Sequence, residues 1–511
     1  MKRRTLLAGV LAGAGALAAK GFPVLGRLPA AAAQPAEFNL RLDDELLTLD
    51  PALMTSGEDY AVAYVVYSGL VRQTPGSTEI LPDLATKWDL SPDGRTYTFH
   101  LRQGVKWQRG FGELTAADVK YSLDRIKDPK LGSRFRADLE PVRAVTAVDP
   151  YTVTITLDKP YGAFLSSVLA YRPGYIVNQR ALERYGKDYS ANVVGTGPYV
   201  VDQWVPGQGV HVSANKDFYG PPPKIQRAMF RIVPDASTAE IALERGDLDV
   251  SYFDVPDVMQ RISRSNRVGS KSIVGPRTYW VHFNMERPPF DDVRVRQALN
   301  YATNKSDVVQ RIWLGQGTVA NSVLNPNMFG YLKAERYPYD PERARALLAE
   351  AGFPAAAKNK TFDFISDGTG DWPDMAAVLQ QQWRAVGVRI QITALDRAVF
   401  EQRRQAHQFD MLAINSLRLE PDQILVPYFD SAQIPYPNVS SYRGADALIE
   451  GARDAVDPQK RLEFYAAAQQ KIQADAPVVP LLYPNILYAW RPGVKGVVPG
   501  LLVYRLETYS I

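Results

Sequence analysis

Strand and helix signals alternate along most of this chain, and this alternation limits its fold more than any other feature of the sequence. Apolar residues take every second position at 97–101 and 153–157, which is the pattern of half-buried strands. Capping boxes at 115–118 and 237–240 and the pair Asp340-Pro341 each precede a stretch with helical spacing, and Gly352 suits the end of the last one. No internal repeat interrupts the pattern, so the sequence predicts a mixed α/β fold.

The charge of the chain is unevenly distributed. Its 59 Lys plus Arg and 55 Asp plus Glu give a formal net charge of +4. All five charged residues of the first 33 are positive, namely Lys2, Arg3, Arg4, Lys20 and Arg27, so the remainder has 54 positive against 55 negative charges, a net charge of −1. Binding of nucleic acid or anionic membranes depends on a basic surface, and neither is expected here.

The first 33 residues resemble an export signal. The pair Arg3-Arg4 precedes a Leu- and Ala-rich run from Leu6 to Ala19, and small residues precede an expected cleavage near Ala33. The twin arginines resemble a twin-arginine signal, and the apolar run is too short to span a bilayer. The chain contains no cysteine, which excludes disulfides, thiol catalysis and a lipid-modified cysteine. We therefore expect an unanchored periplasmic protein.

Catalytic and metal-binding motifs are missing from the sequence. It has no nucleophile elbow, no His-Glu-x-x-His pair and no phosphate-binding Gly-x4-Gly-Lys-Ser/Thr loop. Asp291 and Asp292 are interpreted as charges at a helix start, with Arg294 and Arg296 forming solvated salt bridges to them. The sequence therefore favours a binding protein without a catalytic residue, a metal site or a cofactor.

Seven sequence blocks occur in an order that is similar to one known family. They are the region VVYSGLVRQ to YSLDRI (65–126), VGTGPYVV (194–201), NKDFYG with RIVPDASTAEIALERGDLDV, FNMERPPFDDVRVRQALNYATNK (283–305), YDPERARALLAEAGF (339–353), QQQWRAVGVRI with FDM (409–411), and YAAAQQKIQADAPVVPLL. Together they resemble the extracellular solute-binding proteins of family 5, the dipeptide, oligopeptide and nickel group that serves ABC importers.

This resemblance implies a two-lobed periplasmic-binding α/β fold. The first lobe would contain residues 34–70, 195–277 and 484–511, an extra sub-domain would span 71–194, and the second lobe would span 278–483. Tyr279–Asn284 and Pro480–Pro484 would form a two-strand hinge about which the lobes close on a small solute. The family resemblance also implies a monomer that delivers its solute to a permease, with the ATPase on a separate subunit.

Candidate ligand contacts also follow from the resemblance. Ser56, Gly57 and Tyr60 match a loop that approaches the ligand backbone in dipeptide-binding members. Those proteins hold the ligand's ammonium with an Asp, and alignment on Glu420-Pro421 places Leu417 at that position. They hold its carboxylate with an Arg, but no Arg or Lys occurs from 361 to 383. A buried charge without its partner costs several kcal/mol, so we do not expect an ordinary free dipeptide.

Other residues of the second lobe complete the candidate site. Asp371 and Trp372, in an acidic loop from 366 to 374, suit sugar hydroxyls beside an indole or a cation over a ring. Arg418 suits an anionic group of the ligand, and Asn415 is the remaining candidate. The alternative, that the acidic loop is solvated and Arg418 lies on the surface, stays open.

The sequence leaves three functional hypotheses. The first is an importer-associated receptor for a peptide-like, opine-like or carbohydrate-type solute. The second is a receptor for a nickel or other metal chelate, with His282 and His407 as candidate contacts. The third, disfavoured because no nucleophile and base are paired, is an exported hydrolase.

Overall fold

The computed structural model describes residues 37–73, 79–333, 336–353, 360–501 and 503–511. Glu37–Ile511 forms one compact unit, and the predicted export signal lies outside the described residues. Among the described helices, none combines the length and the apolar character that crossing a membrane requires.

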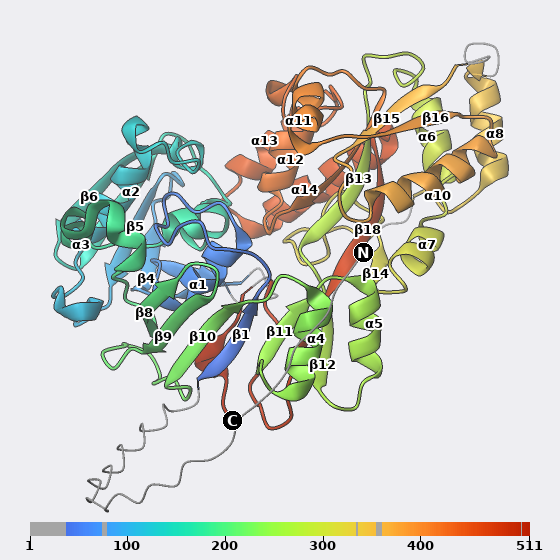
Figure 1. The fold of residues 1–511 in the computed structure, drawn as a ribbon. Coiled ribbons are helices and arrows are strands. Elements are labelled where there is room, and N and C mark those ends of the chain that lie inside the picture. The colour runs from blue at the N-terminus through green and yellow to red at the C-terminus, as the bar shows by residue number, and fades with distance from the viewer. Residues whose placement is uncertain (1–36, 74–78, 334–335, 354–359, 502) are drawn as a thin grey trace, which may run out of the picture. The chain divides into compact units, whose positions relative to one another are not determined.

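Most of the described strands belong to one large sheet (Figure 1). From edge to edge it runs β16 (Ile390–Ala394), β15 (Phe362–Ser366), β17 (Met411–Leu417), β13 (Arg277–Phe283), β18 (Val478–Trp490), β11 (Val250–Phe253), β1 (Phe38–Leu42), β10 (Arg227–Ile232), β9 (Gly209–Ala214) and β8 (Tyr199–Val205). Two further strands, β12 (Gly269–Val274) and β14 (Gly317–Val319), also pair with β18. A four-stranded sheet runs β4 (Ala85–Leu90), β5 (Thr96–Leu101), β7 (Thr152–Leu157), β6 (Val142–Asp149), and β2 (Val71–Gln73) pairs with β3 (Ile80–Pro82).

Helices occur between these strands along the whole described chain. They are α1 (Gly57–Val66), α2 (Ala116–Lys127), α3 (Gln179–Tyr185), α4 (Ala236–Arg245), α5 (Pro256–Arg264), α6 (Val293–Tyr301), α7 (Lys305–Asp307), α8 (Pro341–Glu350), α10 (Trp372–Arg384), α11 (Arg397–Gln405), α12 (Asp422–Phe429), α13 (Asp446–Asp454) and α14 (Pro458–Asp475). The predicted mixed α/β class is therefore confirmed.

Local signals predicted several of these elements correctly. The alternating runs are β5 and β7, each with every second residue buried. The capping box of Thr115 and Asp118 is present at the start of α2. Asp340 caps α8, where its side chain accepts a hydrogen bond from the Arg343 amide.

The capping box predicted at 237–240 is wrong. The helix α4 begins earlier, because the Asp235 carboxylate accepts the Thr238 amide at 2.7 Å and is itself the cap. Glu240 instead pairs with Arg261 of α5 through two hydrogen bonds from Arg261 Nε. Two capping residues within three positions compete for the same amides, and the sequence does not say which one wins.

The interpretation of Arg296 as a solvated charge is also wrong. Arg296 is 3% exposed and donates hydrogen bonds to the carbonyl oxygens of Phe290, Asp291 and Asp475. Its neighbour Arg294 does pair with Asp292 at the surface. Arg296 therefore ties α6 to the end of α14.

The buried apolar side chains gather in separate clusters that β18 connects. The largest cluster includes side chains of β1, α1, the four-stranded sheet and β8–β10. Two others lie on the opposite faces of β13, which contributes Val281 to one and Trp280 to the other. The first half of β18 pairs with β13 and its second half with β11, so one strand runs from one set of clusters to the other.

Candidate functional site

The start of α1 is held rigidly by a buried carboxylate. Asp59 is fully buried and accepts hydrogen bonds from the amides of Leu47 at 2.8 Å, Thr48 at 3.1 Å, and Thr55 and Ser56 at 3.2 Å. The Ser56 hydroxyl accepts the Asp59 amide at 3.0 Å and caps the helix. The predicted contact residue Ser56 therefore has a structural task of its own.

The other end of α1 is fixed by the loop of Gly195 and Gly197. The Gly197 amide donates to the Val66 carbonyl at 2.9 Å, and a Cβ on Gly195 would lie 2.0 Å from the same oxygen. Gly57 at the opposite end has no atom within 4 Å of where its Cβ would be. Space beside Gly57 is therefore open, while the helix that carries it cannot shift easily.

Tyr60 belongs to a cluster of aromatic rings. Its ring is 9% exposed and its centroid lies 5.5 Å from that of Tyr171 and 6.2 Å from that of Tyr175. The Arg172 guanidinium lies 5.1 Å from the same ring. These rings adjoin a pocket that Tyr60, Tyr175 and others line. Burial raises the pKa of Tyr60, which keeps its phenol neutral.

Two carboxylates follow directly after two parallel neighbouring strands. Asp43 comes after β1 and Asp254 after β11, and these strands pair in parallel. Ligands of α/β proteins bind outside such carboxyl ends of strands. Tyr252 donates to Asp43 at 3.0 Å, and Arg277 Nη1 lies 3.9 Å from Asp254 Oδ2. Sequence analysis missed these residues, although an acid after each of two buried strands was a usable signal.

Glu58 and Asp371 extend this group from two helix starts. Burial, followed by the hydrogen bond and charge of Asp43, raises the pKa of Glu58 to about 7. Burial and the charge of Asp254 also raise the pKa of Asp371, while Arg277 lowers it. We call Asp43, Glu58, Asp254, Arg277 and Asp371 the acid–arginine cluster. It contains one residue that the sequence predicted, Asp371.

The predicted contacts on β17 and α10 lie beside this cluster. Asn415 is opposite Tyr279 and Leu417 is opposite Arg277 in the pairing of β17 with β13. Trp372 is 2% exposed, and its ring centroid lies 5.2 Å from that of Tyr279. The indole is thus packed in the core, and a ligand contact through it stays a prediction.

Arg418 lies at the surface and faces a different carboxylate. Its guanidinium donates to the Leu417 carbonyl at 2.9 Å. Burial raises the pKa of Asp138 to about 6, and the positive charges of Arg418 and Arg134 act against this. An anionic ligand group at Arg418 would compete with Asp138, and this contact also stays a prediction.

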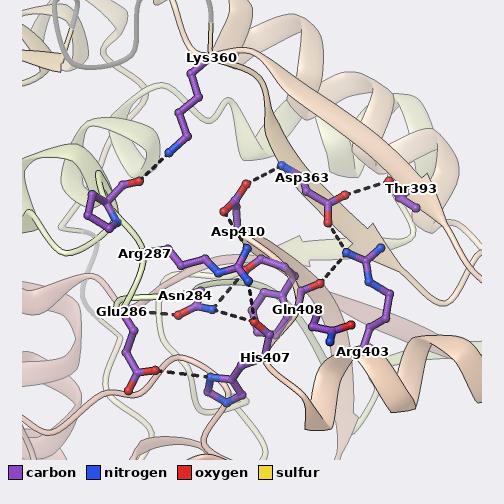
Figure 2. Close-up of polar contacts among 12 residues, drawn as sticks. Asn284, Glu286, Arg287, Lys360, Asp363, Thr393, Arg403, His407, Gln408 and Asp410 are labelled. Atoms are coloured by element: carbon purple, nitrogen blue, oxygen red, sulfur yellow. Dashed lines mark hydrogen bonds and ion pairs between the residues drawn. The ribbon is translucent and has the colours of Figure 1, made fainter.

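The histidines proposed as metal contacts have other partners. His282 is fully buried, its Nδ1 lies 2.8 Å from the Ser440 hydroxyl, and burial lowers its pKa to about 3. Figure 2 shows His407 facing Glu286, with Nδ1 and Oε2 4.0 Å apart, within a network of arginines and carboxylates. Across the described ranges, no group of three or more His, Asp or Glu side chains is placed to hold a metal ion.

Comparison with known proteins shows the family. The model described as bacterial extracellular solute-binding proteins, family 5 Middle, matches residues 79–435. The chain belongs to this family. The dipeptide-binding protein of Escherichia coli (strain K12) is 31% identical and aligns with 90% of this chain and 92% of its own length. Heme-binding protein A of Haemophilus influenzae is 30% identical and aligns over 90% and 89%. Family 5 proteins are solute-binding components of ABC importers, so these relatives are transport proteins rather than enzymes.

Solved structures of the family superimpose on nearly the whole chain. HbpA2 from Haemophilus parasuis has a TM-score of 0.86 at 26% identity, covering 93% of this chain and 100% of its own. MoaA from A. tumefaciens R10 in complex with mannopinic acid and NikZ from Campylobacter jejuni in complex with Ni(L-His) each have a TM-score of 0.74, at 29% and 26% identity, covering 93% of this chain and 99% of their own. The periplasmic binding-protein fold is confirmed, and the family accommodates chemically different ligands.

Proposed function

We propose that this chain captures a solute with a cationic amino group between two lobes and delivers it to the permease of an ABC importer. The lobes have the boundaries that the sequence predicts, and β13 and β18 act as the hinge. Separate apolar clusters on the two sides of this strand pair support such a hinge, because the lobes can move without opening one shared core.

The acid–arginine cluster is the observation that carries the choice of solute. Four carboxyl groups surround a single arginine, and burial together with mutual repulsion raises the pKa values of Glu58, Asp254 and Asp371. An ammonium group would relieve this repulsion, while Arg277 can pair with a carboxylate of the same ligand. Peptide-like and opine-like solutes carry both groups.

The remaining parts of the proposal concern location and partners. The 1–33 segment directs export by the twin-arginine route, and the mature chain is a periplasmic monomer without a lipid anchor. It binds its solute without catalysing a reaction, and the ATPase belongs to another subunit of the importer.

A thermal-shift screen with defined probes tests the solute class. Alanyl-alanine, putrescine, mannopinic acid, maltotriose and Ni(L-His) are each added to the chain without its first 33 residues. We expect stabilisation by an amine-bearing probe, which reaches about 2.7 kcal/mol at 100 times its dissociation constant. Asp371→Asn should weaken this binding at least about tenfold, because an ion pair with a partly buried carboxylate is lost.

Asp374→Asn is the matched control, since Asp374 is an exposed carboxylate on the same helix. It should leave affinity within about twofold. Stabilisation by maltotriose alone, with unchanged affinity in Asp371→Asn, would contradict the proposed amino group.

A further inference from the structure

The segment that follows β7 contacts the α12–α14 region through its backbone. The Gly162 amide donates to the Arg453 carbonyl at 2.7 Å, and Gln423 Nε2 donates to the Ser167 carbonyl at 3.4 Å. A Cβ on Gly162 would lie 2.0 Å from the Ala455 carbonyl oxygen. The two parts therefore approach as closely as a glycine allows.

A pair of buried carboxyl groups lies at this contact. Glu420 is 2% and Asp422 5% exposed. Arg461 donates to Glu420 at 2.8 Å, and the Tyr465 hydroxyl donates to Asp422 at 2.7 Å. Arg453 Nε lies 3.8 Å from Asp422 Oδ2. Two acids and two arginines are thus enclosed where two parts of the chain meet.

The two sides of the contact have separate apolar cores. Phe164 and Val168 belong to the cluster of α1 and the four-stranded sheet, whereas Ile424 and Tyr465 belong to a cluster beside β13. What joins them here is polar. Polar contacts between separate cores separate more readily than a shared apolar core does.

We propose that Glu420 and Asp422 form a proton-sensitive latch between the sub-domain and the second lobe. The latch biases the lobes toward the arrangement in which the solute is enclosed, and this role rests on the proposed lobe closure. It adds a regulation by pH that solute binding alone does not supply.

The sign of the pH effect follows from burial. In the latched arrangement burial raises the pKa of Glu420 from 4.5 to about 7. The groups that face the two carboxyls are Arg453, Arg461, Tyr465, Tyr161 and Ser166. Separation exposes Glu420 to water, where its pKa returns toward its ordinary value. The latched form therefore binds more protons between pH 4.5 and 7, so a fall in pH favours latching.

A distance measurement without any solute tests the latch. Because the chain has no cysteine, Lys187→Cys and Glu450→Cys introduce the only thiols, at two exposed positions on the two sides. A dye pair on these thiols reports lobe separation by single-molecule energy transfer. From pH 8 to pH 5 we expect the ratio of latched to separated molecules to rise at least about tenfold.

Variants decide which groups are responsible. Glu420→Gln should keep the latched ratio high at both pH values, because a neutral amide replaces the titrating carboxyl. Glu463→Gln, an exposed site on α14, should follow the unsubstituted chain. Gly162→Ala should favour separation at both pH values through the clash with Ala455.

Two results would overturn the latch: a ratio that does not change with pH, or a Glu420→Gln variant with the same pH curve as the unsubstituted chain. Since no solute is present, either result is independent of the probe screen. A failed screen with a pH-dependent ratio would reject the proposed solute and keep the latch.

Discussion

At the scale of the residue, the most demanding side chain near the site is Asp59. A buried carboxylate is stable only when hydrogen bonds replace its lost hydration. Asp59 receives them from four backbone amides that precede α1. The position of Ser56, Gly57 and Glu58 therefore depends on one carboxylate.

Replacing this carboxylate by an amide tests that dependence. Asp59→Asn places an NH2 group against backbone N–H groups, so we expect the free energy of unfolding to fall by about 3 kcal/mol. Urea denaturation at pH 7 measures it. Asp188→Asn, at an exposed position, should change it by less than about 0.5 kcal/mol. Equal effects of the two substitutions would refute the structural role of Asp59.

At the scale of the element, Arg296 joins α6 to the last turn of α14. Its guanidinium contacts three carbonyl oxygens, including Asp475 O at 2.7 Å. A lysine has no planar fork to reach all three. We expect Arg296→Lys to lower the free energy of unfolding by about 2 kcal/mol, and Arg294→Lys at the surface by less than about 0.5 kcal/mol. Chemical denaturation of both variants measures the difference, and a larger loss in Arg294→Lys would reverse the assignment.

At the scale of the whole molecule, charge separates the leader from the rest. The first 33 residues carry five positive charges and no negative one, and the other 478 residues have a net charge of −1. The proposed twin-arginine route requires Arg3 and Arg4 in particular, whereas a general secretory signal needs only positive charge.

Substitution by lysine separates these two routes, because it keeps the charge. The double variant Arg3→Lys with Arg4→Lys should reduce the processed periplasmic protein at least about tenfold, as measured by cell fractionation and immunoblotting. Arg27→Lys should leave export unchanged. Normal processing of the double variant would assign the chain to the general secretory route.

Elements whose signals are local were predicted well from the sequence. The alternation in β5 and β7 and the cap of α2 depend on residues within a few positions of each other, as do the blocks that resemble family 5. The wrong boundary of α4 arose where Asp235 and Ser237 compete for the same amides, which local spacing alone does not resolve.

The sequence by itself determined the α/β class, the family and the positive leader. Only the tertiary structure brought Asp43 and Asp254 beside Arg277 and Asp371, enclosed Glu420 with Asp422, and buried Arg296 against α14. The physical reason is that charge and spacing are properties of the chain, whereas burial and repulsion depend on which distant segments meet. The parallel pairing of β1 with β11 makes that choice for the proposed site.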